Sequence, residues 1–117
     1  INNAVYFSYT AMARMELVEQ ALGQDAWWNC VAARVEIDYL REIPVSQREV
    51  VVRSVVLRIG NSSVRLREEA LLEDGAVAAR AEAVIVFRNR ETGKSRPLTG
   101  EERAALQPFV LPEEPEV

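Results

Sequence analysis

The sequence predicts an α+β domain in which one long helix is wrapped by an antiparallel β-sheet. Three observations predict this architecture: a long, mostly apolar helical segment comes first, four strand-like segments joined by turn signals follow, and one short helical segment comes near the end. A helix that is apolar on nearly all sides is usually surrounded by other elements, so the strands are its expected partner. The 117 residues amount to a single domain, expected to span 1–117.

The first element is expected to be a helix from Ala4 to Leu22. Asn2 or Asn3 can cap its start, and Gly23 can end it. Apolar residues at three-four spacing predict one buried stripe, made of Ala4, Ala11, Met15, Val18 and Leu22. The opposite side also carries few charges, so the helix is expected to be buried on most of its circumference.

Four strands are expected to follow this helix. Residues 31–39 alternate between apolar and polar side chains, which predicts a half-buried strand with Val31, Ala33, Val35, Ile37 and Tyr39 on its inner face. A connection at 43–48, which contains Pro44, leads to a Val-rich second strand at 49–59. A hairpin turn at 60–62 leads to the third strand, 63–72, and a turn at Asp74-Gly75 leads to the fourth strand, 76–88. The alanines of the fourth strand suit close approach of a helix.

The chain ends in a basic stretch, a short helix and a tail. The basic stretch, 88–96, surrounds Thr92-Gly93, and Thr99 with Glu102 forms a capping box that opens a helix to about Gln107. The tail, 108–117, is expected to be frayed. Periodicity alone leaves three arrangements open: a hotdog fold, a cystatin-like fold, or a fragment of a larger sheet.

Composition excludes several classes of function. The net charge is −4, so nucleic acid is not an expected partner, and no apolar run reaches the ~20 residues of a membrane span. The single cysteine, Cys30, cannot form an internal disulfide, which favours a reducing, cytoplasmic location. The chain has no histidine, which excludes a Ser-His-Asp or Cys-His mechanism and any His-ligated metal site. No cofactor and no metal are therefore expected.

The start of the chain resembles a known enzyme family. Asn2, Asn3, Ala4 and Tyr6, followed by Ala13-Arg14-Met15-Glu16, resemble the helix start of the 4-hydroxybenzoyl-CoA thioesterase family, which typically has Gly-His-Val-Asn-Asn-Ala-x-Tyr and then Ala-Arg-x-Glu. Later stretches with the same resemblance are 35–40, 60–63 and 90–94. The resemblance covers nearly the whole chain.

This resemblance implies a hotdog-fold acyl-CoA thioesterase that hydrolyses a thioester to a free acid and coenzyme A. It implies active sites at the interface of a homodimer, an acidic nucleophile or general base on the loop before the helix, and backbone N–H groups at the helix start that polarise the carbonyl. The chain begins at Ile1 rather than Met. The catalytic carboxylate and the usual first strand are therefore expected to lie before Ile1.

Each candidate site residue also has an ordinary structural interpretation. Asn3 is the expected oxyanion donor through its N–H, with Asn2 beside it, but both are also common helix caps. Asn61, Ser62 and Ser63 form a turn or contact the pantetheine arm, and Tyr6 is expected to contact the substrate. Arg88, Arg90 and Lys94, with Arg96, form a solvated charged run or a clamp for coenzyme A phosphates.

Three smaller expectations and two alternatives complete this interpretation. Cys30 is expected to be a buried apolar residue, Trp27 and Trp28 to cover the end of the helix or an acyl pocket, and Glu16 to be structural. Open sheet edges favour a homodimer or homotetramer. The alternatives to a thioesterase are a non-catalytic hotdog binding module, and another hotdog acyl-CoA enzyme such as a hydratase, which would usually need a His-Asp pair.

Overall fold

The computed structural model describes residues 3–43 and 50–111. A helix, α1 (Asn3–Leu22), and a short 3₁₀ turn, η1 (Gln24–Asn29), precede the strands. The strands are β1 (Cys30–Tyr39), β2 (Val51–Ile59), β3 (Ser63–Leu71) and β4 (Val77–Phe87), followed by α2 (Gly100–Leu106) and η2 (Gln107–Phe109). The expected order of elements is confirmed; residues 44–49 of the expected connection and second strand lie outside the described residues.

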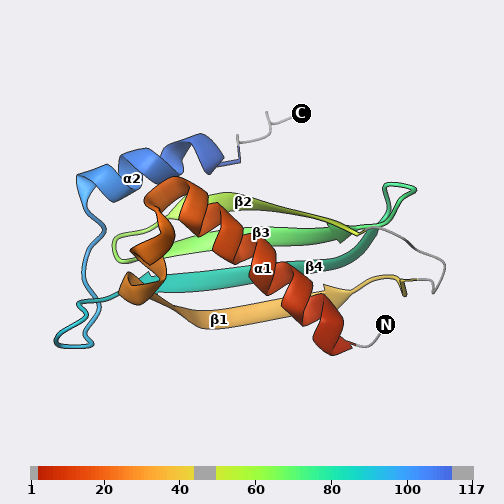
Figure 1. The fold of residues 1–117 in the computed structure, drawn as a ribbon, viewed down its shortest axis with the longest axis horizontal. Helices are drawn as coiled ribbons and strands as arrows, with labels where there is room; N and C mark the ends of the chain where they lie inside the picture. The colour runs from red at the N-terminus through yellow and green to blue at the C-terminus, as the bar shows by residue number, and fades with distance from the viewer. Residues whose placement is uncertain (1–2, 44–49, 112–117) are drawn as a thin grey trace.

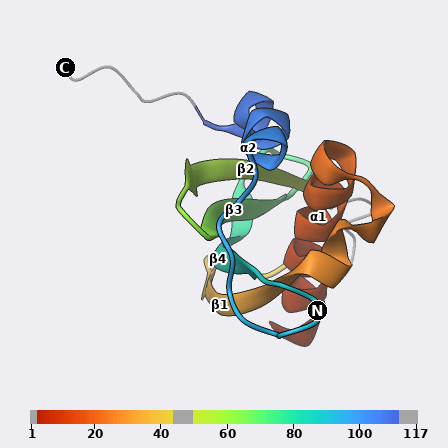
Figure 2. The same cartoon turned by 90° about the vertical axis from the view of Figure 1, so that its left-hand side faces the viewer.

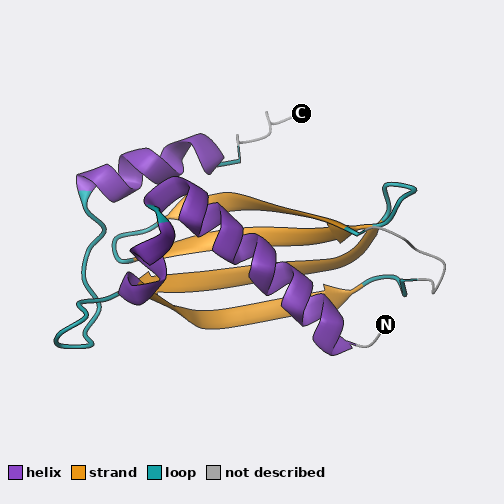
Figure 3. Ribbon diagram, viewed as in Figure 1, coloured by secondary structure: helices purple, strands orange, loops and turns teal. Residues whose placement is uncertain are grey.

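The four strands form one antiparallel sheet in the order β1-β4-β3-β2. The helix α1 crosses one face of this sheet diagonally, and the other face carries no described helix (Figures 1, 2 and 3). The short helix α2 lies beside β2, close to the end of α1 (Figure 1). The α+β architecture predicted from the sequence is therefore confirmed.

The side of α1 that meets the sheet differs from the predicted stripe. Val18 is fully buried as expected, but its buried companions are Thr10, Ala13, Arg14 and Leu17. Met15, which was predicted to be buried, is 45% exposed, and Met12 beside it is 65% exposed. The prediction that most of the circumference is buried is therefore wrong for this chain, because the sheet covers one side of the helix and nothing in the described residues covers these methionines.

The inner face of β1 was also predicted only in part. Cys30 is 3% exposed, whereas Val31 and Tyr39, both expected to face inward, are 36% and 44% exposed. A bulge between Ala32 and Arg34 explains the start of the strand, because one extra residue reverses which positions face the sheet interior. Since β1 is also an edge strand, its far half remains exposed even where the expected alternation holds.

The inner faces of β3 and β4 form the core. The alanine-rich face of β4 is buried as predicted, including Ala79, Ala81 and Ala83, and one cluster joins Phe87 and Ile85 to α1 and α2. The capping box of α2 is confirmed: Thr99 Oγ1 accepts from the Glu102 N–H, and Glu102 accepts from the Thr99 N–H. In the segment expected to be a tail, Val110 bridges Val56 of β2.

Candidate active site

The start of α1 lies at the end of the sheet where β1 finishes (Figure 1). Asn3 is the first helical residue; Asn2 lies outside the described residues, as do the side chains of Asn3 and Tyr6. The first N–H groups of a helix have no intrahelical partner and lie at the positive end of its dipole. Asn3 therefore lies at the first position of α1, and its role as an oxyanion donor, like the roles of Asn2 and Tyr6, stays a prediction.

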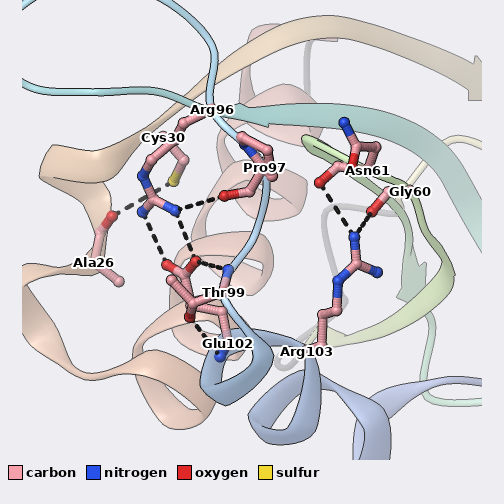
Figure 4. Close-up of polar contacts among 9 residues, drawn as sticks. All are labelled: Ala26, Cys30, Gly60, Asn61, Arg96, Pro97, Thr99, Glu102 and Arg103. Carbon is pink, nitrogen blue, oxygen red and sulfur yellow. Dashed lines mark hydrogen bonds and ion pairs between the residues drawn. The ribbon is translucent and has the colours of Figure 1, made fainter.

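The hairpin at 60–63 lies at the opposite end of the sheet and is held by hydrogen bonds to neighbouring segments. The Gly60 N–H donates to the Ser63 carbonyl at 2.7 Å, and the Ser62 carbonyl accepts from the Phe87 N–H at 2.8 Å. Arg103 Nη2 donates to the carbonyls of Gly60 and Asn61 at 2.8 and 3.2 Å (Figure 4). The Asn61 carbonyl also accepts from the Leu98 N–H at 2.9 Å. These bonds occupy backbone carbonyls, so a pantetheine contact by Asn61, Ser62 or Ser63 would use other atoms of the hairpin.

The basic stretch after β4 is a tight turn in which Arg90 and Lys94 are exposed and Arg88 is half-buried. Asn89 Oδ1 accepts from the N–H groups of Glu91 and Thr92, and Gly93 has a φ of 72°, which favours glycine. Lys94 is exposed, Arg90 lies over the ring of Trp28 at 5.8 Å, and Trp28 itself is 62% exposed. The Nε of Arg88 is buried without a hydrogen-bond partner among the described residues. Trp28 therefore lies at the surface beside the cation of Arg90, and the side chain of Trp27 lies outside the described residues.

Arg96 differs from the other cations of this stretch. Its guanidinium lies 5.5 Å from the centre of the Phe87 ring and forms two hydrogen bonds with Glu102, at 2.8 and 3.0 Å (Figure 4). These hydrogen bonds lower the pKa of Glu102, although burial opposes the shift. Arg96 thus joins β4 to α2. Its contacts differ from those of Arg88, Arg90 and Lys94, so it has a structural role that these three cations do not share.

Cys30 lies next to this ion pair and has a buried, unreactive thiol. Its Sγ donates to the Ala26 carbonyl at 3.6 Å (Figure 4). Burial, and after it the negative charge of Glu102, raises the pKa of the thiol to about 11. The expectation that Cys30 is a buried apolar residue is confirmed.

A groove on the outer face of the sheet runs beside the hairpin. It has a volume of about 390 Å³ and is lined by Arg58, Gly60, Ser63, Arg65 and Val84. Sequence reasoning missed Arg58 and Arg65, whose only sequence signal is that both lie close to the predicted hairpin. Together with Ser63 they offer cationic and hydroxyl donors to an anion.

One chain does not bring its predicted catalytic and binding residues together. Tyr9, near the start of α1, packs with Leu72 and Ala79, whereas Leu22, at the other end, packs with the cluster that contains Val64 and Phe87. A helix of 20 residues spans about 30 Å. Asn3 and the hairpin with the basic turn are therefore separated by roughly the length of α1.

Two other features bear on the chemistry. Among the described residues, no group of three or more Cys, Asp and Glu side chains could hold a metal ion. None of the helices in 3–43 and 50–111 is long and apolar enough to cross a membrane.

Comparison with known proteins assigns a family to this arrangement. The sequence profile of the Thioesterase-like superfamily matches residues 1–113. A thioesterase from Thermus thermophilus, whose structure is a complex with coenzyme A and Zn, is 30% identical over 93% of this chain and 80% of its own, with a TM-score of 0.82. A protein described as a predicted thioesterase from Bacillus stearothermophilus is 28% identical over 97% of this chain and 86% of its own, with a TM-score of 0.87. No curated protein matches the chain. The solved structures confirm the expected hotdog fold.

Proposed function

Because this chain belongs to the Thioesterase-like superfamily, we propose that it is a cytoplasmic acyl-CoA thioesterase that hydrolyses a thioester to a free acid and coenzyme A. The observation that carries the proposal is the likeness to the Thermus thermophilus thioesterase complexed with coenzyme A, which extends over 93% of the chain. The Asn2-Asn3-Ala4 sequence and the cations Arg88, Arg90 and Lys94 support it from the chain's own residues.

The reaction needs a group that stabilises the developing oxyanion. Water adds to the thioester carbonyl, negative charge collects on its oxygen, and the C–S bond then breaks to release the coenzyme A thiolate, which takes up a proton. The N–H of Asn3, with Asn2 beside it, is the proposed donor to this oxygen. One preorganised donor is worth about 2.7–4 kcal/mol in acyl transfer. A carboxylate is the proposed base or nucleophile.

The proposed site is shared between two copies of the chain. In one chain the helix start and the basic turn lie at opposite ends of the sheet (Figure 1). The edge strand β1 has exposed apolar side chains at Val31 and Tyr39, and Leu40, just after its end, is also exposed. Strand β1 is therefore the natural edge for pairing with a second copy. The basic turn follows β4, whose end pairs with the start of β1, whereas the helix start lies near the end of β1. Antiparallel pairing of β1 with the partner's β1 would bring the start of one strand beside the end of the other. The basic turn of each copy would then lie beside the helix start of the other copy.

This arrangement assigns the remaining candidate residues. Arg88, Arg90 and Lys94 would hold the phosphates of coenzyme A, for which arginine and lysine are the natural partners. Asn61, Ser62 and Ser63 would contact the pantetheine arm, with the outer groove at Arg58 and Arg65 open to a phosphate. Tyr6, on the second turn of α1, would contact the acyl group. A homodimer is the smallest assembly with complete sites, and a homotetramer could form from two such dimers.

Two substitutions at one position test the oxyanion assignment in the complete natural protein. Asn3→Pro removes the proposed N–H at an early helical position that proline can occupy. We expect kcat to fall about 10²-fold or more, with a modest change in stability. Asn3→Ala keeps the N–H and, at the first helical position, should change the free energy of unfolding by less than about 0.5 kcal/mol. Both variants are assayed with a panel of aryl- and alkyl-acyl-CoAs.

Each outcome has one meaning. A folded Asn3→Pro variant that turns over the panel at the parent rate would exclude the backbone donor. A parent protein that binds acyl-CoA without cleaving it would be a binding module, and a parent that neither binds nor cleaves would exclude the thioesterase function.

A further inference from the structure

One ion pair lies buried between α1 and the sheet. Arg14 Nη2 and Nε both donate to Glu68 Oε1, at 2.8 and 3.2 Å, and the two side chains are only 6% and 0% exposed. Glu69, the next residue of β3, pairs with Arg53 and Arg80 on the opposite face, where both guanidinium groups stay largely exposed. Arg14–Glu68 is therefore a different kind of contact, made entirely inside the core.

Stability alone does not explain this pair. Removing two charges from water is expensive, and apolar residues of similar volume are often as stable or more stable in such a place. Burial raises the pKa of Glu68 even though Arg14 opposes the shift. What the pair adds is direction, because its hydrogen bonds require one rotation and one height of the helix, whereas apolar contacts tolerate sliding.

The residues that face Glu68 in the sheet are small. Glu68 lies opposite Ala81 on β4 and opposite Ser54 on β2. Leu17 and Val18 pack into the apolar core beside this pair, and Met12 and Met15 lie exposed on the far side of α1. Glu68 Oε2 and Ser54 Oγ, on these facing positions, are both buried without a hydrogen-bond partner among the described residues. An ordered water between them would tie Glu68 to β2 as well.

Arg14 is eleven residues from Asn3, about 16 Å along the helix axis. A tilt of about 5° at Arg14 would then move the helix start by roughly 1.4 Å. Misplacement of a reacting group by about 1 Å can cost 10²-fold in rate. A small change in how α1 lies on the sheet would thus be large at the helix start.

We propose that Arg14 and Glu68 are positioning residues, which set the rotation and tilt of α1 on the sheet and so place the Asn3 N–H against the thioester carbonyl. This inference rests on the proposed function, but the position of α1 can be measured without it. Neither residue touches substrate; both act through the helix.

The double variant Arg14→Met/Glu68→Met separates positioning from stability in the complete natural protein. Because it leaves no unpaired charge, we expect cooperative unfolding near the parent Tm. We expect kcat to fall 10- to 100-fold with KM changed less than about threefold. Amide hydrogen exchange in the first turns of α1 should also differ from the parent. The matched control is Arg80→Met/Glu69→Met, which removes a pair from the outer face and should leave both kcat and exchange unchanged.

Glu68→Gln should have the opposite effect to the double variant, lowering stability while leaving kcat nearly unchanged. Its carbonyl still accepts from Arg14 and its amide can donate to Ser54 Oγ, so the geometry is kept while the Arg14 charge loses its counter-ion. We expect a lower Tm with kcat within about threefold of the parent at a temperature where the variant is folded.

A folded double variant with parent kcat and parent exchange would overturn the proposal. If the double variant does not fold, Arg14→Lys decides, because it keeps the charge but loses the fork geometry; a parent-like kcat in that variant would count against positioning. If the parent cleaves no acyl-CoA, the proposed function fails, and unchanged helix exchange in the variants would separately remove the positioning role.

Discussion

Val18 and Met15 lie one turn apart on α1, and their substitution tests which side of the helix faces the core. Val18 is 0% exposed and Met15 is 45% exposed. Val18→Ala removes two methylene equivalents, worth about 0.8 kcal/mol each, and leaves a cavity, for a total of about 2–3 kcal/mol. For a domain of this size that corresponds to a fall in Tm of roughly 10 °C. Val18→Asp adds an unpaired buried charge whose cost is comparable to a typical total stability of ~5–15 kcal/mol, so this variant should not fold.

The control is Met15→Ala, which removes a partly exposed side chain and inserts the best helix former. We expect its free energy of unfolding to stay within about 0.5 kcal/mol of the parent. Thermal and urea unfolding followed by circular dichroism measure all three variants. A cooperative Val18→Asp transition, or a Met15→Ala loss equal to that of Val18→Ala, would refute the assigned helix face.

Three further predictions concern the region around α2. Thr99→Ala should cost ~1 kcal/mol in urea unfolding, because it removes one half of the capping box; an unchanged midpoint would mean that the box contributes nothing. Because the pKa of Glu102 is lowered from its ordinary value of 4.5, its ionised form stabilises the fold above that pH, and this contribution is lost as the pH falls through the lowered pKa. Urea unfolding between about pH 3 and 7 should therefore show a shallower acid dependence in Glu102→Gln than in the parent. Cys30, with its pKa raised to about 11, should react with an aromatic disulfide reagent only on unfolding, and reaction in native buffer at the rate of a free thiol would contradict its burial.

The order and approximate bounds of the elements could be predicted because they depend on local pattern. The Val-rich and alternating strands, the hairpin at 60–63 and the Thr99–Glu102 capping box each follow from residues close together in the sequence. Fold and family followed from the short run of residues at the start of α1.

The rotation of α1 could not be predicted from its own residues. Apolar residues lie on nearly every side of this helix, so periodicity favoured a stripe that contains Met15. In the structure a different side of α1 faces the sheet. The carboxylate of Glu68, 54 positions away, pairs with Arg14, so the side of the helix that carries Arg14 faces inward. The bulge between Ala32 and Arg34 likewise depends on pairing with β4 and leaves no mark in the alternation of β1.

The candidate site could be predicted as a set of residues but not as an arrangement. Arg88, Arg90, Lys94 and Arg96 look equivalent in the sequence, yet Arg96 is taken up by Glu102 and Phe87. Arg58 and Arg65 were missed because arginines on strands are ordinary surface residues until a groove joins them. The separation of the helix start from the basic turn depends on the direction in which α1 crosses the sheet.

That separation links the exposed edge of the sheet to the proposed chemistry. An unpaired edge strand with exposed apolar side chains is a liability that native proteins pair or protect, and β1 has such an edge. The pairing that would cover β1 in a second copy is antiparallel, so it would exchange ends: the basic turn of each copy would lie next to the helix start of the other. The proposed interface and the proposed active site are then one structure. Placing the oxyanion donor within about 1 Å would depend on two fixed relationships, β1 against its partner and α1 against the sheet. Of these, the second is the one that the buried Arg14–Glu68 pair sets within a single chain.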